Sequence, residues 1–289
     1  MSDERNPQAQ QMGDESMARN LAFQAQAIWP QEERLFARYR LSGPLRILDL
    51  GCGTGEITRR LADLYPQAQI VGVDILETNL ELARRAGAQV PQRPGMAERG
   101  RRQGGAHAGR VTYACGDAFA LNFADAHFDL VVCRHMSQSV PDFHLVLDEI
   151  GRVLRHGGWL HLLSEDYAMM RMPRGARDPD RFWVGTVLPY LESVRCDGRI
   201  GRHSPPLLIE RGYTELAVDY VIVDTMRVPR ETFAEILVAW RDGFAEVLAS
   251  SSGRELGDVR ADFDSMIEAI RTPPGYAVWH VPVISARRT

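Results

Sequence analysis

From Leu45 onward, short apolar runs alternate with amphipathic helical stretches, and no other feature restricts the fold of this chain as strongly. Parallel strands covered by helices on both faces produce this pattern, because each strand is then buried on both sides. Five strands are predicted in the first part of this alternation: Arg46–Leu50, Gln69–Asp74, Val111–Gly116, Phe128–Cys133 and Gly158–Ser164. The pattern predicts an α/β fold with a doubly wound, mostly parallel sheet of the Rossmann-like type.

Two further strands are predicted near the C-terminus, at Leu216–Asp224 and Ala277–Ala286, and they bring the sheet to seven strands. The sequence contains no internal repeat and no change of composition that marks a second folding unit. We therefore expect one unit in three parts. These are an N-terminal helical cap (residues 1–44), a ligand-binding core (residues 45–166), and helical insertions joined to the last two strands (residues 167–289).

Local signals place several helix boundaries. Helical patterns run from Asp14 to Gln26 and from Gln31 to Tyr39. Pro30 lies between them and fits the start of the second helix, because proline is well tolerated in the first turn of a helix. A helix beginning after Asp142 carries apolar residues at helical spacing. Asp142 is a candidate N-cap for it, and Gly157–Gly158 is a candidate C-terminal cap.

The composition is that of a globular protein, with 289 residues of which 45% are hydrophobic and 25% charged. All 34 basic residues are arginine, and the formal net charge of −4 gives no overall basic field for nucleic acid. The four cysteines lack the spacing of a disulfide framework or a zinc site, so we expect reduced thiols and no metal. The polar Met1–Gln11 segment does not resemble a signal peptide, and no apolar run approaches the roughly 18 residues of a membrane span. These features predict a cytoplasmic protein with no membrane partner.

A glycine-rich turn follows the first predicted strand, with Gly51, Gly53 and Gly55 at alternate positions. Glycines at such a turn let a ligand approach the backbone, and the following helix N-terminus offers free amides. A nicotinamide cofactor calls for G-x-G-x-x-G, but Glu56 occupies the sixth place and would face the pyrophosphate. Because Asp49 precedes the turn, the pattern fits a ligand that carries an ammonium and a carboxylate and no phosphate. The methionine part of S-adenosylmethionine has both groups.

Acidic residues also end the second and third predicted strands. Asp74 is placed to accept both ribose hydroxyls across the crevice at the strand ends, and Asp117 to accept from an adenine amino group. Ile75 and Phe119 are placed to pack on the ring faces. An isolated acid is more often a helix cap or a turn residue. With Asp49, however, three acids end neighbouring strands in register with the glycine turn, and this favours a nucleoside site.

With these residues, the chain resembles the class I S-adenosylmethionine-dependent methyltransferases, in their small-molecule branch. The resemblance extends from Arg46 to Ser164 and rests on the motifs DLGCGTG, VGVD, CGDA, FDLVVCRH and LRHGGWLHLL. It implies S-adenosylmethionine as cofactor, and these cofactor-binding residues: Asp49, Gly51, Cys52, Gly53, Gly55, Asp74, Ile75, Asp117, Ala118 and Arg134. Asp49 and the glycine turn would hold the methionine part, and the backbone around Arg134 would line the sulfonium.

Two segments are expected to face the methyl acceptor, because both follow strands at the ligand edge of the sheet. His135 is a candidate base for a hydroxyl or amine, and its alternative is a structural histidine under the next helix. Glu165 and Asp166 would orient the acceptor or act as base, and otherwise cap the segment that follows. The candidate walls of the acceptor site are Phe23, Trp29 and Tyr167, although aromatic residues are more often part of the core.

The sequence thus predicts an enzyme that methylates a small molecule at oxygen or nitrogen, with carbon less favoured. An RNA or DNA methyltransferase would use the arginine-rich stretch Gly87–Gly109 as its footprint, but the composition of that stretch is more typical of a mobile surface loop. A non-catalytic module that binds S-adenosylmethionine is a further alternative. The sequence determines neither the acceptor nor the oligomeric state, and a lid made by the N-terminal helices is a hypothesis that it raises.

Overall fold

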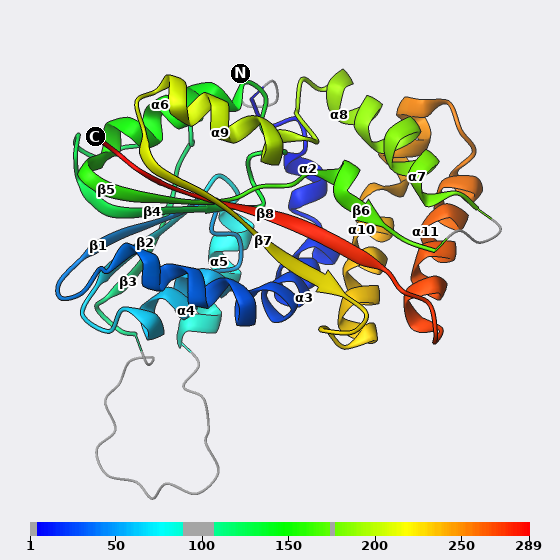
Figure 1. The fold of residues 1–289 in the computed structure, drawn as a ribbon, viewed down its shortest axis with the longest axis horizontal. Coiled ribbons are helices and arrows are strands. Elements are labelled where there is room, and N and C mark those ends of the chain that lie inside the picture. The colour runs from blue at the N-terminus through cyan, green and yellow to red at the C-terminus, as the bar shows by residue number, and fades with distance from the viewer. Residues whose placement is uncertain (1–4, 89–106, 174–176) are drawn as a thin grey trace, which may run out of the picture.

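One central sheet organises the molecule (Figure 1). The computed structural model describes residues 5–88, 107–173 and 177–289. The strands are β1 Arg46–Leu50, β2 Gln69–Asp74, β3 Val111–Cys115, β4 Phe128–Arg134, β5 Leu154–Leu163, β6 Met170–Arg171, β7 Thr214–Asp224 and β8 Val278–Arg287. Their order is β3-β2-β1-β4-β5-β8, and β7 pairs with the other side of β8. The seven predicted strands are all present, and β6 is a short addition that pairs with the start of β8.

The first five strands are parallel, and the last two long strands are antiparallel. Because β1 lies between β2 and β4, the chain reverses its direction of travel across the sheet at β1. Ligands of doubly wound sheets bind at the carboxyl ends of the strands at such a switch point. The topology therefore places the glycine turn after β1 at the expected ligand edge.

Helices cover both faces of the sheet and extend beyond one end of it (Figure 1). They are α2 Ala9–Met12, α3 Glu15–Glu32, η1 Glu33–Tyr39, α4 Glu56–Leu64, α5 Glu77–Ala88, α6 Phe143–Val153, η2 Tyr167–Met169, α7 Pro179–Phe182, η3 Trp183–Val187, α8 Leu188–Ser193, α9 Ile200–Glu210, α10 Arg230–Ser252 and α11 Leu256–Arg271. One apolar cluster joins α6 and α9 to one face, and a second joins α4, η1 and part of α3 to the other. A third apolar cluster lies between α3, α8, α10, α11 and the start of β8, and it is the core of the second half of the molecule.

Three local predictions were wrong in detail. Helix α3 runs through Pro30 and continues as η1, where a break was predicted, because the buried faces of Ile28, Trp29 and Glu32 keep the chain helical. The strand β5 begins directly after α6, so Gly157 lies within the strand with φ of +73° and does not cap the helix. Asp142 does precede α6, but its carboxylate pairs with Arg195 and caps nothing.

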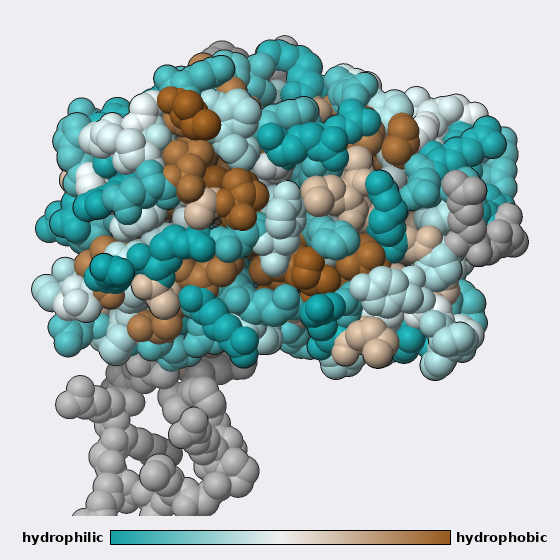
Figure 2. All heavy atoms as spheres, in the orientation of Figure 1, coloured by the Kyte–Doolittle hydropathy of each residue, from teal (hydrophilic) through white to brown (hydrophobic). Residues whose placement is uncertain are grey.

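The surface of the face shown in Figure 2 is mixed, with small apolar groups separated by hydrophilic side chains. Val218 and Tyr220 on β7 are 43% and 48% exposed and belong to the outermost strand of this edge. No helix within the described ranges is long and apolar enough to span a membrane. The arginine-rich stretch was predicted at Gly87–Gly109, and its residues 89–106 lie outside the described residues.

Candidate active site

A first cavity, here called the strand-end cavity, lies over the carboxyl ends of β1, β2 and β4. Gly51 and Gly53 line it with φ of +73° and +50°, a left-handed conformation that glycine adopts without strain. A β-carbon at Gly53 would lie 2.5 Å from Cδ1 of Leu21 on α3. The glycine turn is therefore needed both for its own backbone and for the close passage of α3. Ile75 and Ala118, two further predicted cofactor residues, also line this cavity.

The carboxylate of Asp74 holds the glycine turn in place at the rim of the strand-end cavity. Its Oδ2 accepts a hydrogen bond from the Gly53 amide at 2.8 Å, and its Oδ1 accepts one from the Leu76 amide at 2.9 Å. Burial raises the pKa of Asp74, although these backbone hydrogen bonds oppose the shift. Each oxygen still has acceptor capacity for a ligand, because a carboxylate oxygen can accept more than one hydrogen bond.

Four predicted cofactor residues are not among those that line the strand-end cavity. Asp49 is buried beneath the turn and accepts from the Thr58 hydroxyl at 2.6 Å. Cys52 is buried. Gly55 precedes α4 and lies so close to the Tyr113 side chain that a β-carbon would not fit, so this glycine allows α4 to pack there. Asp117 accepts from the Phe119 amide at 2.9 Å and faces the guanidinium of Arg5 at 3.7 Å.

Arg134 ends β4, and its side chain lines the strand-end cavity while being only 8% exposed. Its Nε donates to Oε1 of Glu32 on α3 at 2.7 Å, and this Oε1 also lies 2.9 Å from Nε2 of His161. Burial opposes ionisation of Glu32, but the charge of Arg134 and the contacts with His161 outweigh it and lower the pKa of Glu32 to about 2. The Nη2 of Arg134 is buried and has no partner. An arginine is thus held in place with a hydrogen-bond donor to spare.

His135 and Glu165 form a buried pair at the ends of the neighbouring strands β4 and β5. Nδ1 of His135 lies 2.5 Å from Oε1 of Glu165, and the side chains are 7% and 1% exposed. His135 has φ of +52°, which is uncommon for a residue with a β-carbon and is often found at functional sites. Its Nε2 is buried without a partner. The two side chains therefore lie together at the ends of adjacent strands.

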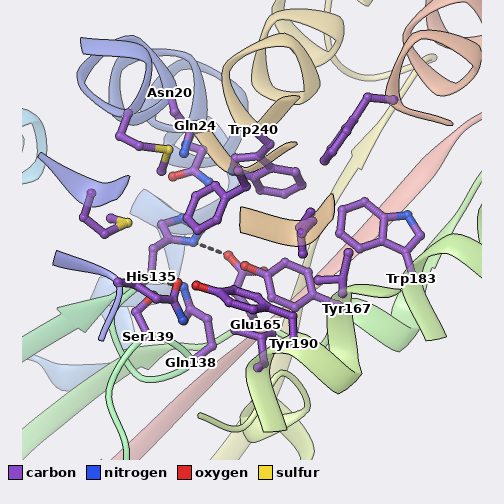
Figure 3. A pocket seen from close by; sticks show the side chains of 18 of the residues that line it. Asn20, Gln24, His135, Gln138, Ser139, Glu165, Tyr167, Trp183, Tyr190 and Trp240 are labelled. Carbon is purple, nitrogen blue, oxygen red and sulfur yellow. Dashed lines mark hydrogen bonds and ion pairs between the residues drawn. The ribbon is translucent and has the colours of Figure 1, made fainter. Parts of the chain in front are cut away.

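The pair opens into a second cavity, here called the aromatic cavity, which Figure 3 shows from close by. The ring side chains that line it are Tyr167, Trp183, Tyr190, Trp240, Phe244 and Phe263. Tyr167 and Trp183 stack with their centroids 5.5 Å apart. His135 and Ser139 line both cavities, as do Gln8, Met12 and Leu21 of the N-terminal segment. The two cavities therefore meet at the connection that leaves β4.

Several polar side chains around the aromatic cavity have buried atoms with no hydrogen-bond partner. They are Gln8, Asn20, Gln24, His135, Gln138, Glu165, Trp183 and Tyr190. Buried polar groups in folded proteins are nearly always satisfied, and each exception needs an explanation. Because these atoms gather around one cavity, a bound ligand or ordered water is the simplest partner for them.

Three candidates from the sequence lie elsewhere among the described residues. Asp166 is fully buried and forms a two-point ion pair with Arg202 of α9, at 2.5 and 2.9 Å. Trp29 packs in the core with its ring 5.6 Å from that of Phe36. Phe23 packs against the apolar cluster around α10. Of the predicted acceptor walls, only Tyr167 lines the aromatic cavity.

Sequence reasoning missed the residues that give the aromatic cavity its character. Trp240 lies on the buried face of α10, and Asn20 and Gln24 resemble solvent-facing positions of α3. Gln138 follows His135 by three residues in the segment after β4, and this position in the sequence is a signal that could have found it. The others come from elements whose packing no local pattern reveals.

The strand-end cavity fits the chemistry of S-adenosylmethionine. It offers positive-φ glycines where a ligand approaches the backbone, a carboxylate at the end of β2, and the unpartnered Nη2 of Arg134. These groups match a ribose and an amino acid, and Asp74 would repel a pyrophosphate at the same place. The residues therefore agree with the cofactor that the glycine spacing predicted.

Comparison with known proteins finds methyltransferases. A family model described as "Methyltransferase domain" matches residues 48–162. Demethylmenaquinone methyltransferase of Deinococcus radiodurans is 34% identical over 121 residues, which are 42% of this chain and 43% of that protein. Malonyl-[acyl-carrier protein] O-methyltransferase of Legionella pneumophila is 36% identical over 129 residues, 44% of this chain and 39% of that protein. The chain spans about half the length of the curated relatives it matches.

Solved structures show the same fold at lower sequence identity. Phosphoethanolamine N-methyltransferase 2 of Haemonchus contortus, with S-adenosyl-L-methionine bound, has a TM-score of 0.53 and 19% identity, and the match covers 90% of this chain and 52% of that one. Geranyl diphosphate C-methyltransferase of Streptomyces coelicolor has a TM-score of 0.53 and 16% identity, covering 90% and 79%. These likenesses show the fold, and the family match places a methyltransferase domain at residues 48–162, in agreement with the resemblance that the motifs predicted.

Proposed function

We propose that this protein transfers a methyl group from S-adenosylmethionine to an oxygen or nitrogen atom of a small molecule. The observation that carries the proposal is the meeting of the two cavities at His135. The cofactor would occupy the strand-end cavity, and the acceptor would occupy the aromatic cavity. When bound, the cofactor supplies an electrophilic methyl group on a positively charged sulfur. Holding the acceptor atom in line with that methyl group is the largest contribution an enzyme can make to such a displacement.

The cofactor residues divide by the part of the ligand that each would hold. The backbone of Gly51 and Gly53 would contact the methionine part, and Asp74 the ribose. Ile75 and Ala118 line the cavity where the adenine would pack. Asp117 remains a predicted partner of the adenine amino group, and Arg5 would have to leave its carboxylate to make room.

The His135–Glu165 pair would serve the acceptor as a base. If Nδ1–H donates to Glu165, Nε2 carries the free lone pair and is the atom that accepts a proton. Glu165 then fixes the ring orientation and stabilises the imidazolium that forms, as the acid does in other histidine–carboxylate pairs. The acceptor loses its proton to Nε2 as its bond to the methyl carbon forms. Asp166 would support this pair only indirectly, because Arg202 occupies both of its oxygens.

A nucleic-acid acceptor is less well supported by the site. The residues that line the aromatic cavity include no arginine, and the chain has no lysine, so the described part of the cavity offers no group for a phosphate backbone. A non-catalytic module would not need an unpartnered base between two cavities. We therefore favour an enzyme whose acceptor is a small molecule.

The substitution His135→Asn tests the proposal. Asparagine tolerates positive φ and keeps a donor for Glu165, but it removes the basic nitrogen. We expect the variant to bind S-adenosylhomocysteine like wild type in calorimetry, and to lose about 10²- to 10⁴-fold in kcat/KM with the best of a panel of small phenols and amines. The matched control is His144→Asn, which changes an exposed histidine on α6. Full activity in His135→Asn, or wild-type protein that does not bind S-adenosylhomocysteine, contradicts the proposal.

A further inference from the structure

We infer that the methyl acceptor is an uncharged aromatic molecule and that it is methylated on a ring hydroxyl. This inference rests on the proposed function and specifies its substrate class. The aromatic cavity is the smaller of the two, with a volume of about 60 Å³ against about 90 Å³ for the strand-end cavity, so the acceptor is smaller than the cofactor.

The charges around the aromatic cavity exclude an anionic acceptor. The chain has 34 arginines, yet none is among the described residues that line this cavity, and Glu165 contributes a carboxylate that is 1% exposed. A phosphate or carboxylate placed there would be desolvated beside a like charge, which is strongly unfavourable. Stacked and edge-on rings of Tyr167, Trp183 and Trp240 offer instead a wall for a planar apolar ligand.

The free Nε2 of His135 selects the reacting group. With Nδ1 donating to Glu165, Nε2 can only accept, so it needs a ligand that donates a hydrogen. An ammonium would meet the positive charge of the bound cofactor and must lose a proton before it can react. A phenol enters neutral, and its proton passes to Nε2 while the oxygen forms a bond to the methyl carbon. The carbon–sulfur bond breaks with its electron pair left on sulfur, and His135 later returns the proton to solvent.

Three matched probes test this substrate class on wild-type protein saturated with S-adenosylhomocysteine. They are p-cresol, 4-methylbenzoate and 4-methylbenzylamine, which share a ring and differ in charge. We expect p-cresol to bind at least about tenfold more tightly than 4-methylbenzoate in calorimetry. When S-adenosylmethionine, which carries the sulfonium charge, replaces the product, we expect p-cresol to give 4-methylanisole at least about tenfold faster than 4-methylbenzylamine is methylated. Equal or tighter binding of the benzoate, or methylation of the amine at the same rate or faster, overturns the inference. Failure of S-adenosylhomocysteine itself to bind overturns the proposed function instead.

The substitution Glu165→Gln tests the charge argument separately. Removing the buried carboxylate charge should raise the affinity for 4-methylbenzoate by about tenfold and leave p-cresol binding within about threefold of wild type. The control is Glu192→Gln, which makes the same change at an exposed position of α8 and should alter neither affinity. An unchanged affinity for 4-methylbenzoate in Glu165→Gln shows that charge does not set the selectivity.

A second inference rests on a different observation, in the strand-end cavity. We propose that Arg134 binds the carboxylate of the cofactor's amino acid part and that Glu32 is its positioning residue. Arg134 is the one arginine among the described residues that line this cavity, and its buried Nη2 has no partner. Glu32 is fully buried on α3. Its Oε1 accepts a hydrogen bond from Nε of Arg134 and also contacts His161. The guanidinium is thereby oriented before the ligand arrives.

Two ligands, one with and one without the amino acid part, distinguish carboxylate binding by Arg134 from a general loss of stability. S-adenosylhomocysteine has the carboxylate, and 5′-methylthioadenosine has the same nucleoside without it. We expect Arg134→Gln to weaken S-adenosylhomocysteine by about 10- to 100-fold and to leave 5′-methylthioadenosine unchanged, with a smaller selective loss for Glu32→Gln. Arg59→Gln on α4, which pairs with Glu56 outside the cavity, is the control. Equal losses for both ligands, or no loss for S-adenosylhomocysteine, overturn the assignment.

Discussion

Two buried carboxylates that both feel the charge of Arg134 show how strongly its surroundings decide the state of a single residue. Glu32 contacts Arg134 and His161 directly, and its pKa falls to about 2. Asp49 is also buried, but only the Thr58 hydroxyl bonds to it and Arg134 acts from farther away, so burial raises the pKa of Asp49 to about 6. One acid therefore stabilises the fold by being charged, and the other opposes it at neutral pH.

The substitution Asp49→Asn makes this difference measurable. The pKa of Asp49 is about 6 in the folded protein and near 3.8 in the unfolded chain. The protonated carboxyl group is therefore favoured by folding, and its contribution to stability is fully present below pH 3.8 and is lost as pH rises through 6. The loss amounts to about 3 kcal/mol, at 1.36 kcal/mol for each pKa unit. We expect the unfolding free energy of the variant, relative to wild type, to rise by about this amount between pH 4 and 7 in urea titrations. The control Asp63→Asn changes a side chain that is 75% exposed, and a constant difference across the pH range contradicts the prediction.

At the scale of elements, the sequence predicted the sheet much better than the helices around the aromatic cavity. Strands β1 to β4 match their predicted ranges to within one residue, because they are mostly apolar, as in Ile47–Leu50, where only Asp49 is charged. The break at Pro30 was wrong because tertiary packing outweighs a local signal. The polar face of α3 resembled a solvent face, and only packing against α10 shows that Asn20 and Gln24 are buried. The motifs of the strand ends could thus be read from sequence, whereas the residues of the aromatic cavity could not.

At the scale of the whole molecule, the N-terminal segment connects the two cavities, since Gln8 and Met12 line both. The division into three parts and the lid formed by this segment remain predictions. A ligand in one cavity should order these residues for the other, which makes the two affinities interdependent. Such a coupling acts equally in both directions.

Deletion of residues 1–13 tests this coupling. In full-length protein we expect S-adenosylhomocysteine to raise the affinity for p-cresol by about fivefold or more, and p-cresol to raise the affinity for S-adenosylhomocysteine by the same factor. In the shortened protein both factors should fall, because Gln8 and Met12 are missing from the wall that the two cavities share. Calorimetric titrations of each ligand with and without the other measure the two factors. Undiminished coupling after the deletion would show that the segment does not transmit it.

Because α3 serves both cavities, its position limits how relatives of this protein can diversify. Leu21 lines both cavities, Glu32 contacts Arg134 of the strand-end cavity, and Asn20 and Gln24 line the aromatic cavity. Mutations that shift α3 and reshape the aromatic cavity would therefore also change the strand-end cavity. The described parts of α8 and α10 line only the aromatic cavity, so new specificities should arise there first, in laboratory selection as in natural history.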